Sequence, residues 1–491
     1  MTKENLLLII GGYFLALYAI SKLIKSDGSN DSFFTGKRSS KWYLVAFGMI
    51  GTSLSGVTFI SVPGWVGSNA MAYMQVVLGY FIGYAIIAQV LLPLFYKSKI
   101  TSIYSILEES MGKEGRLSAA IFFQLSRILG ASFRLYLVCI VLNNFLLADY
   151  NLPFWVSVII SIGLILVYTQ KGGIKTIVIT DTIQTLFMLL AVGVSLYAIL
   201  SSLDMSVMEL IQVSGDKGYT EIFNFNDVKE SGHFLKQFFG GALIALTMTG
   251  LDQDMMQKNL SCKSLKESQK NMWTFSTVLI FVNAVFLLFG AALLVFATEK
   301  GIELPSKTDE IFPMLALDNH LGIWPQILFA LGLIAAAYSS ADSAIAALTT
   351  SMYCDVLSYD KKLSGKDAIR KRKMVQTLVC GLVFVVIVLF NAYNEQSVIG
   401  QLLYAATYTY GPILALFAMH ILKIEVKFRP VIYAAVIIAP VLCYLLNVYD
   451  TEILGGYDFG YEMLLVNALL TMILCVVPNY LLPNKTVNKQ A

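Results

Sequence analysis

A cluster of small and hydroxyl-bearing residues around Asp342 is the part of the sequence best suited to holding an ion. Ser339, Asp342 and Ser343 recur at helical spacing, as do Ala336, Ser339 and Ser340, so each set shares one face of a helix. Sodium is a hard cation that prefers oxygen ligands, and two hydroxyls beside a carboxylate supply them. Small residues also let helices pack closely, which is the alternative explanation for the serines. The carboxylate of Asp342 favours the ion site.

Arginine and aspartate residues recur inside apolar segments of the chain. Ionisable side chains are costly in lipid and usually face a cavity or one another. They are Arg127, Arg134, Asp181, Asp252, Asp254 and Asp342. Arg127 and Arg134 share a helix face, and a buried guanidinium can hold a carboxylate through a bidentate fork. An ion pair between Arg134 and an internal acid explains the residue equally well.

Two apolar segments are interrupted by residues that weaken helices. Glycine, serine, threonine and proline crowd the stretch from Met49 to Gly64, and the stretch from Phe239 to Gln257 has the same character. This composition predicts broken helices whose freed backbone carbonyls line a site near the middle of a membrane. The two stretches lie five apolar segments apart, so each would begin an inverted repeat of five helices.

Long apolar segments must position these residues. Of 491 residues, 57% are hydrophobic and 14% are charged, whereas soluble domains carry about 25% charged residues. The mean hydropathy is +0.69. A spanning helix needs about 20 mostly apolar residues. The sequence predicts about thirteen spans, near 5–25, 43–67, 71–96, 118–147, 153–169, 175–201, 235–257, 272–297, 321–351, 373–391, 396–421, 429–447 and 461–482.

The loops between these spans alternate in charge. Basic residues follow every odd-numbered span up to the eleventh and are densest at 361–373, whereas the loops at 202–234 and 448–460 are acidic. Basic loops lie in the cytoplasm by the positive-inside rule. We therefore expect a multi-pass protein of the plasma (inner) membrane, with its N-terminus outside and its C-terminus in the cytoplasm. No loop is long enough for a separate soluble domain.

Composition also argues against several classes of function. The six cysteines and three histidines form no cluster with zinc-ligand spacing, and they supply no nucleophile–base set for an enzyme. The net charge of +3 gives no support for nucleic-acid binding. The expected partners are a lipid bilayer, a small solute and an ion. A channel would also have polar spans, but it needs no paired broken helices.

Four segments resemble the sodium/solute symporter family. Residues 252–258 are similar to its motif N-Q-x-x-x-Q-R, with Asp252 for Asn and Lys258 for Arg, and residues 172–184 are similar to its G-G and T-D-x-x-Q pattern. Residues 336–340 match the sodium-site segment of that family, and residues 408–412 resemble its tenth core helix. The resemblance covers essentially the whole chain.

The resemblance implies an all-α polytopic membrane protein with the LeuT-type inverted-repeat fold. One membrane transporter domain would then cover residues 1–491. It would comprise a leading helix and cytoplasmic loop (1–42), a first five-helix repeat (43–201), a second five-helix repeat (235–421) and two trailing helices (429–482).

The resemblance also implies a sodium site between the first and eighth core helices. Its ligands would be the carbonyls of Gly51, Leu54 and Ala336 and the hydroxyls of Ser339 and Ser340, with Asp181 nearby or joining it. Some relatives bind a second sodium one turn further along. The corresponding residues here are Asp342 and Ser343, which predict a second cation or a coupled proton.

The family's solute contacts come from the unwound core helices and from two others. Carried over, they are Ser55, Thr58, Gln75, Arg134, Thr249, Tyr404, and Thr407 or Tyr408. The function implied is import of a small polar solute coupled to Na⁺ by alternating access. Arg134 favours an anionic solute such as a sugar acid; a neutral sugar, a polyol or an amino acid is the alternative.

Overall fold

A computed structural model describes residues 3–24, 27–143, 147, 150–393 and 398–478, which form helices and no β-strand. The helices of the first half are α1 (Lys3–Leu23), α2 (Asn30–Thr35), α3 (Trp42–Ser53), α4 (Gly56–Asn69), α5 (Tyr73–Ile86), α6 (Leu92–Ser98), α7 (Leu107–Val141), α8 (Phe154–Leu203) and α9 (Val207–Asp216). Those of the second half are α10 (Phe234–Ala245), α11 (Gln253–Leu260), α12 (Leu265–Lys300), α13 (Ile311–Leu317), α14 (Ile323–Ser351), α15 (Gly365–Tyr393), α16 (Val398–Ile421), α17 (Val431–Val448), α18 (Asp450–Ile453) and α19 (Met463–Val476).

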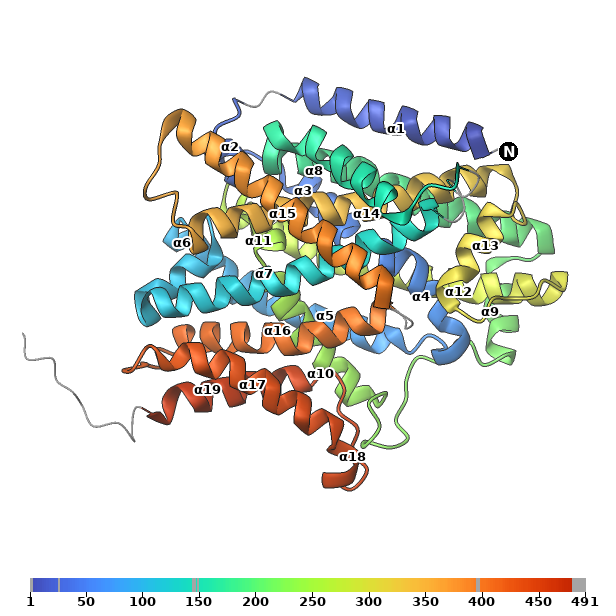
Figure 1. Ribbon diagram of the computed structural model, residues 1–491. Coiled ribbons are helices and arrows are strands. Elements are labelled where there is room, and N and C mark those ends of the chain that lie inside the picture. The colour runs from blue at the N-terminus through green and yellow to red at the C-terminus, as the bar shows by residue number, and fades with distance from the viewer. Residues whose placement is uncertain (1–2, 25–26, 144–146, 148–149, 394–397, 479–491) are drawn as a thin grey trace, which may run out of the picture.

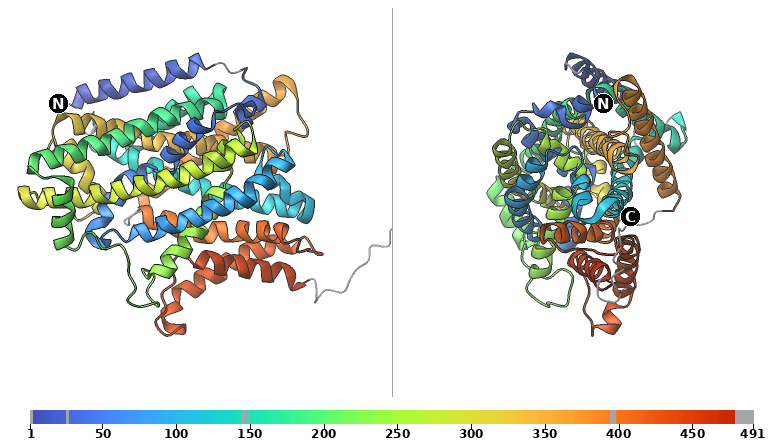
Figure 2. Two further views of the ribbon diagram at one scale, coloured as in Figure 1. Left: turned by 180° about the vertical axis from the view of Figure 1, so that it is seen from behind. Right: turned by 90° about the vertical axis from the view of Figure 1, so that its left-hand side faces the viewer.

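The long helices lie side by side in one bundle (Figures 1 and 2). Within the part of the chain that the structure describes, eight helices are long and apolar enough to cross a membrane. The number rises to as many as ten if each of two bent helix pairs counts as one span. Phe154–Val167 and Met463–Val476 are shorter apolar helices. The multi-span character is therefore confirmed, while the count of thirteen and the repeat layout stay predictions. Helix α1 begins at one end of the bundle and α19 ends at the other (Figure 2).

Helix α8 covers two of the expected spans, 153–169 and 175–201, without a loop between them. Its helical geometry is broken only at Gly173, where φ is +55°. A Cβ at this position would lie 2.3 Å from the Cα of Phe33 in α2. Glycine is therefore needed here both for the backbone angle and for the close approach of α2.

Both interrupted helices are confirmed. Helices α3 and α4 meet at an angle of 52°, and the helix that ends with the π-helical turn η6 (Leu246–Gly250) meets α11 at 63°. The first break lies at Leu54 and Ser55, between the two helices. At the second break, the side chain of Asp252 caps α11 by accepting hydrogen bonds from the backbone of Asp254 and Met255. Each break leaves helix-terminal backbone groups inside the bundle.

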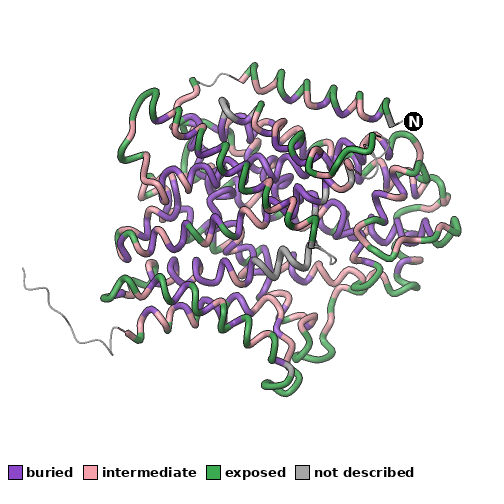
Figure 3. The backbone as a smooth tube through the Cα atoms, viewed as in Figure 1, coloured by how far each residue is buried: buried purple, intermediate pink, exposed green. Residues whose placement is uncertain are grey.

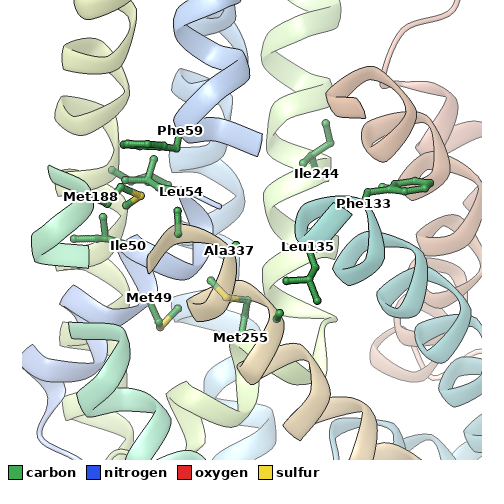
Figure 4. Packing of buried hydrophobic residues seen from close by; sticks show 14 of the residues in the cluster. Met49, Ile50, Leu54, Phe59, Phe133, Leu135, Met188, Ile244, Met255 and Ala337 are labelled. Atoms are coloured by element: carbon green, nitrogen blue, oxygen red, sulfur yellow. The ribbon is translucent and has the colours of Figure 1, made fainter. Parts of the chain in front are cut away.

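Helix α14 lies at the centre of the bundle and packs mainly against α8 and α7. Every residue from Phe329 to Ser351 is buried, as expected for a helix that is covered on all sides. Buried backbone accordingly concentrates in the middle of the bundle in Figure 3. Figure 4 shows Leu54, at the first break, and Phe59, just after it in α4, beside Met188 of α8. Apolar packing thus holds the break in place.

Helices α5 and α10 touch through their backbones. A Cβ on Gly79 would lie 1.9 Å from the carbonyl oxygen of Phe238, and one on Gly241 would lie 2.2 Å from that of Val76. Glycines at both positions therefore allow an approach that no other residue would permit. This contact fixes α10, and through it the second broken helix, against the first half of the chain.

Replacing Gly241 by alanine is expected to lower the melting temperature of the purified protein. The added methyl group must push α5 and α10 apart, at a cost of about 1–3 kcal/mol for overpacking. Gly193→Ala in α8 is the matched control, because a Cβ there meets nothing within 4 Å. Equal melting temperatures for the two variants would show that the close contact of α5 and α10 does not stabilise the fold.

Candidate ion and solute site

A cavity lies where the two broken helices pass each other. The break of α3 and α4 contributes Thr52, Ser53, Ser55 and Thr58 to its wall, and the second broken helix contributes Thr249. Helix α5 adds a row of tyrosines and α7 adds two arginines: Tyr73, Tyr80, Tyr84, Arg127 and Arg134. Hydroxyls, aromatic rings and two cations therefore converge on one space inside an otherwise apolar bundle, as is typical of a ligand site.

The predicted sodium ligands come together beside this cavity. Gly51 and Leu54 lie at the end of α3, and Ala336, Ser339 and Ser340 lie on the facing part of α14; the last four side chains are at most 1% exposed. The Ser340 hydroxyl donates to the carbonyl oxygen of Thr52 (3.4 Å), and the hydroxyl oxygens of Thr52 and Ser339 lie 3.4 Å apart. The geometry joins both halves of the predicted site, and ion coordination by these atoms stays a prediction.

Gly51 has a steric reason to be glycine. A Cβ there would lie 2.0 Å from the hydroxyl oxygen of Thr185 on α8. The absence of a side chain lets the end of α3 lie directly on α8, one turn from Asp181. That contact brings the Asp181 carboxylate into the predicted sodium site.

Asp181 is fully buried and lies within hydrogen-bond distance of the site. Its Oδ2 accepts a hydrogen bond from Thr52 (3.2 Å) and forms an ion pair with Lys258 of α11 (2.7 Å). The hydroxyl of Thr52 also accepts a hydrogen bond from the Lys258 ammonium. Sequence reasoning missed Thr52 and Lys258 as site residues. The sequence held a signal for each residue. Thr52 stands between two predicted ligands, and Lys258 follows Asp254 by one helical turn.

The residues expected to hold a second cation are also buried in α14. Ser343 donates its hydroxyl proton to the carbonyl oxygen of Ser339 (2.7 Å), a bond within the helix. Asp342 is fully buried. A role for Asp342 and Ser343 in binding a second cation stays a prediction.

The two arginines of α7 have different surroundings. Arg127 forms an ion pair with Asp254 and a longer one with Asp252 (3.4 Å), whose other oxygen accepts a hydrogen bond from Tyr410 of α16. Arg134 forms no ion pair within the part of the chain that the structure describes, and its Nε has no hydrogen-bond partner. The internal ion pair considered for Arg134 is thus made by Arg127. Arg134 is left with its guanidinium at the cavity wall.

The predicted solute contacts divide into two groups. Ser55, Thr58, Arg134 and Thr249 all line the cavity. Gln75 does not: its amide donates to the carbonyl oxygen of Gly232 (3.3 Å) and accepts from the backbone of Asn224 (3.1 Å). Helix α5 instead presents Tyr73, Tyr80 and Tyr84, which follow at helical spacing and were not predicted.

Two predicted contacts from α16 make hydrogen bonds to the trailing helices, Tyr408 through its side chain and Thr407 through its backbone, and a role for them in solute binding stays a prediction. Tyr408 donates its hydroxyl proton to Asn447 of α17 (2.8 Å), and the backbone oxygen of Thr407 accepts a hydrogen bond from Asn467 of α19 (3.1 Å). Both residues therefore contact the trailing helices. Tyr410, two residues further along, borders a small space next to the arginines. The side chain of Tyr404 lies outside the described residues.

Comparisons with known proteins show the family to which the chain belongs. Residues 33–426 match the sequence model of the sodium:solute symporter family. The chain is 26% identical over 404 residues to the sodium/sialic acid symporter SiaT of Proteus mirabilis (78% of this chain, 76% of that one). It is 25% identical over 387 residues to a putative sodium-dependent multivitamin transporter of Drosophila melanogaster, and the match spans 76% of this chain and 63% of that one.

A solved structure shows the same fold. The outward-open, substrate-bound state of a Na⁺-coupled sialic acid symporter superimposes with a TM-score of 0.80, at 20% identity, over 97% of this chain and 98% of that one.

Proposed function

Because the chain belongs to the sodium:solute symporter family, we propose that it imports a small organic anion together with sodium by alternating access. The membrane is its environment and sodium is its coupling ion. The preferred solute is a carboxylate such as a sugar acid. The charge of the loops supports an orientation with the N-terminus outside and the C-terminus in the cytoplasm.

The position of Arg134 is the main support for an anionic solute. A buried guanidinium at a cavity wall needs an anion, and no described carboxylate pairs with it. The solute would supply that anion through a bidentate fork, which an arginine forms better than a lysine. Relatives named for sialic acid and for monocarboxylates support a carboxylate cargo.

The tyrosines of α5 support a solute with a ring. Tyr73, Tyr80 and Tyr84 line the same cavity as the arginines, and their rings offer apolar faces as well as hydroxyls. A sugar acid would use both parts of the wall, with its carboxylate on Arg134 and its ring against the tyrosines. A neutral sugar would use only the tyrosines, which makes it the second candidate.

The coupling of one sodium ion would be sufficient for accumulation. Moving one positive charge inward gains about 2.3 kcal/mol per 100 mV, and a tenfold sodium gradient adds about 1.4 kcal/mol. Together they support a gradient of a few hundredfold for a neutral solute. One sodium ion with a monovalent anion moves no net charge, so for that cargo the tenfold sodium gradient alone supports about tenfold accumulation. Sodium between α3 and α14 would hold the outward-open state, and solute binding would then permit closure and inward release.

Competition for uptake tests the class of solute. In proteoliposomes with an inward sodium gradient, unlabelled glucuronate is expected to inhibit uptake of labelled sialic acid far more strongly than galactose or proline does. Replacing sodium by choline is expected to abolish uptake, and saturable sodium-dependent counterflow would separate a symporter from a channel. Strong inhibition by galactose alone would remove the preference for an anion.

A further inference from the structure

A lysine ammonium contacts two side-chain oxygen atoms that lie beside the predicted sodium ligands, those of Asp181 and Thr52. Lys258 is 1% exposed, and its Nζ lies 2.7 Å from Oδ2 of Asp181 while donating to the hydroxyl of Thr52. The same Thr52 hydroxyl lies 3.4 Å from that of Ser339, a predicted sodium ligand. The ammonium therefore lies within reach of the oxygens that a sodium ion beside Asp181 would use.

The second break in the bundle explains why a lysine reaches this point. Helix α11 begins at Gln253, after the 63° bend and the capping residue Asp252, and it packs against α3, α8 and α14. Asp254 and Lys258 are one turn apart on this short helix, so both face the site. The two broken helices thus meet through Lys258 and Thr52.

We propose that Lys258 is a tethered cation that shares Asp181 with the transported sodium ion and limits how many ions the site holds. The inference rests on the sodium site of the proposed function. An ammonium and a sodium ion carry the same charge and prefer the same oxygen ligands, so they cannot both occupy Asp181 and Thr52 at close range. Sodium must displace the lysine from Asp181 to bind there.

Asp254 gives the displaced ammonium a second position. Its Oδ1 lies 4.0 Å from the Nζ of Lys258 and accepts no hydrogen bond from the described residues, whereas its Oδ2 is engaged by Arg127. A rotation of the lysine side chain would move the ammonium from Asp181 to this oxygen without leaving it uncompensated. Sodium binding would in this way be transmitted to the Arg127 network at the cavity wall.

Sodium-dependent thermal stabilisation of the purified full-length protein tests the proposal without any solute. Sodium would be titrated against choline at constant ionic strength. Lys258→Gln removes the competing charge, so it is expected to lower the half-saturating sodium concentration about tenfold and to raise the Hill coefficient above that of the wild type. Lys258→Arg keeps the charge and is expected to stay near the wild-type value.

Two further variants make the test specific. Asp254→Asn removes the second position of the ammonium and is expected to raise the half-saturating sodium concentration about tenfold. Lys236→Gln is the matched control, because Lys236 is also a buried lysine near a carboxylate (Glu462, 3.7 Å) but lies away from the site. It is expected to change the melting temperature without changing sodium affinity.

The outcomes separate this inference from the proposed function. If sodium does not stabilise the wild type more than choline does, the sodium site itself is wrong. If it stabilises the wild type and the Lys258→Gln titration is unchanged, or is lost in a folded variant, the tethered cation is wrong. Should Lys258→Gln fail to fold, an unchanged titration in Asp254→Asn would overturn the exchange of the ammonium between the two acids.

Discussion

Replacing Arg134 by glutamine is expected to raise the KM for an anionic solute about 100-fold while sodium-dependent stabilisation persists. A buried, charge-assisted contact of this kind is worth about 3 kcal/mol, which corresponds to about a hundredfold in affinity. Arg134 forms no ion pair with a described residue, so the change breaks no internal pair. Initial rates of labelled solute uptake in proteoliposomes, measured over a range of solute concentrations, check the expectation.

Two comparisons show whether the effect belongs to the carboxylate. Arg134→Lys keeps the charge but loses the bidentate fork, so its KM should fall between those of wild type and Arg134→Gln. Arg372→Gln, at a buried arginine of α15 that stacks on Phe33, controls for the general loss of a buried guanidinium. If Arg134→Gln raises the KM for a carboxylate solute and for its uncharged amide equally, the arginine does not recognise the charge of the solute.

The breaks in the bundle were predictable from local composition. The run of glycine, serine, threonine and proline after Met49 weakens a continuous helix, and the break indeed falls within it, at Leu54 and Ser55. The second break was visible for the same reason, because Gly250 and Asp252 interrupt an apolar run. Breaks of this kind depend on residues that are neighbours in sequence, which is why sequence alone is sufficient.

The partners of the charged residues were not predictable in the same way. Arg127 and Arg134 share a helix face by spacing, but only the tertiary placement of α7 beside α16 and near the start of α11 decides which one meets the acids. The pairing of Lys258 with Asp181 joins residues 77 positions apart in sequence. No periodicity within one helix carries that information.

The rotation of each helix limits prediction of the cavity wall. Gln75 stands in the right helix, yet it faces a loop, while Tyr80 and Tyr84, further along the same helix, reach the cavity. Tyr408 turns towards α17 for the same reason. Predictions by position along a helix thus identified the helices that line the cavity better than they identified the lining side chains.

Replacing Arg127 by glutamine is expected to destabilise the protein by about 3–5 kcal/mol, the cost of leaving buried charges without their partner. Arg127 is the counter-ion of both Asp254 and Asp252, and all three side chains are at most 5% exposed. Asp252 also caps α11 and accepts a hydrogen bond from Tyr410 of α16. The substitution should therefore also destabilise the second break and its contact with α16. A large fall in melting temperature in detergent would report it.

The neighbouring arginine provides the matched comparison, since Arg134→Gln removes the same group from the same helix face without breaking an ion pair. We expect Arg127→Gln to lose stability first and Arg134→Gln to lose solute affinity first. Adding Asp254→Asn to Arg127→Gln removes one of the two stranded charges and should restore part of the melting temperature, which a double-mutant cycle would measure. Equal melting temperatures for the two arginine variants would mean that the Arg127 network does not stabilise the fold, and Arg127 would then become a candidate for binding the solute in place of Arg134.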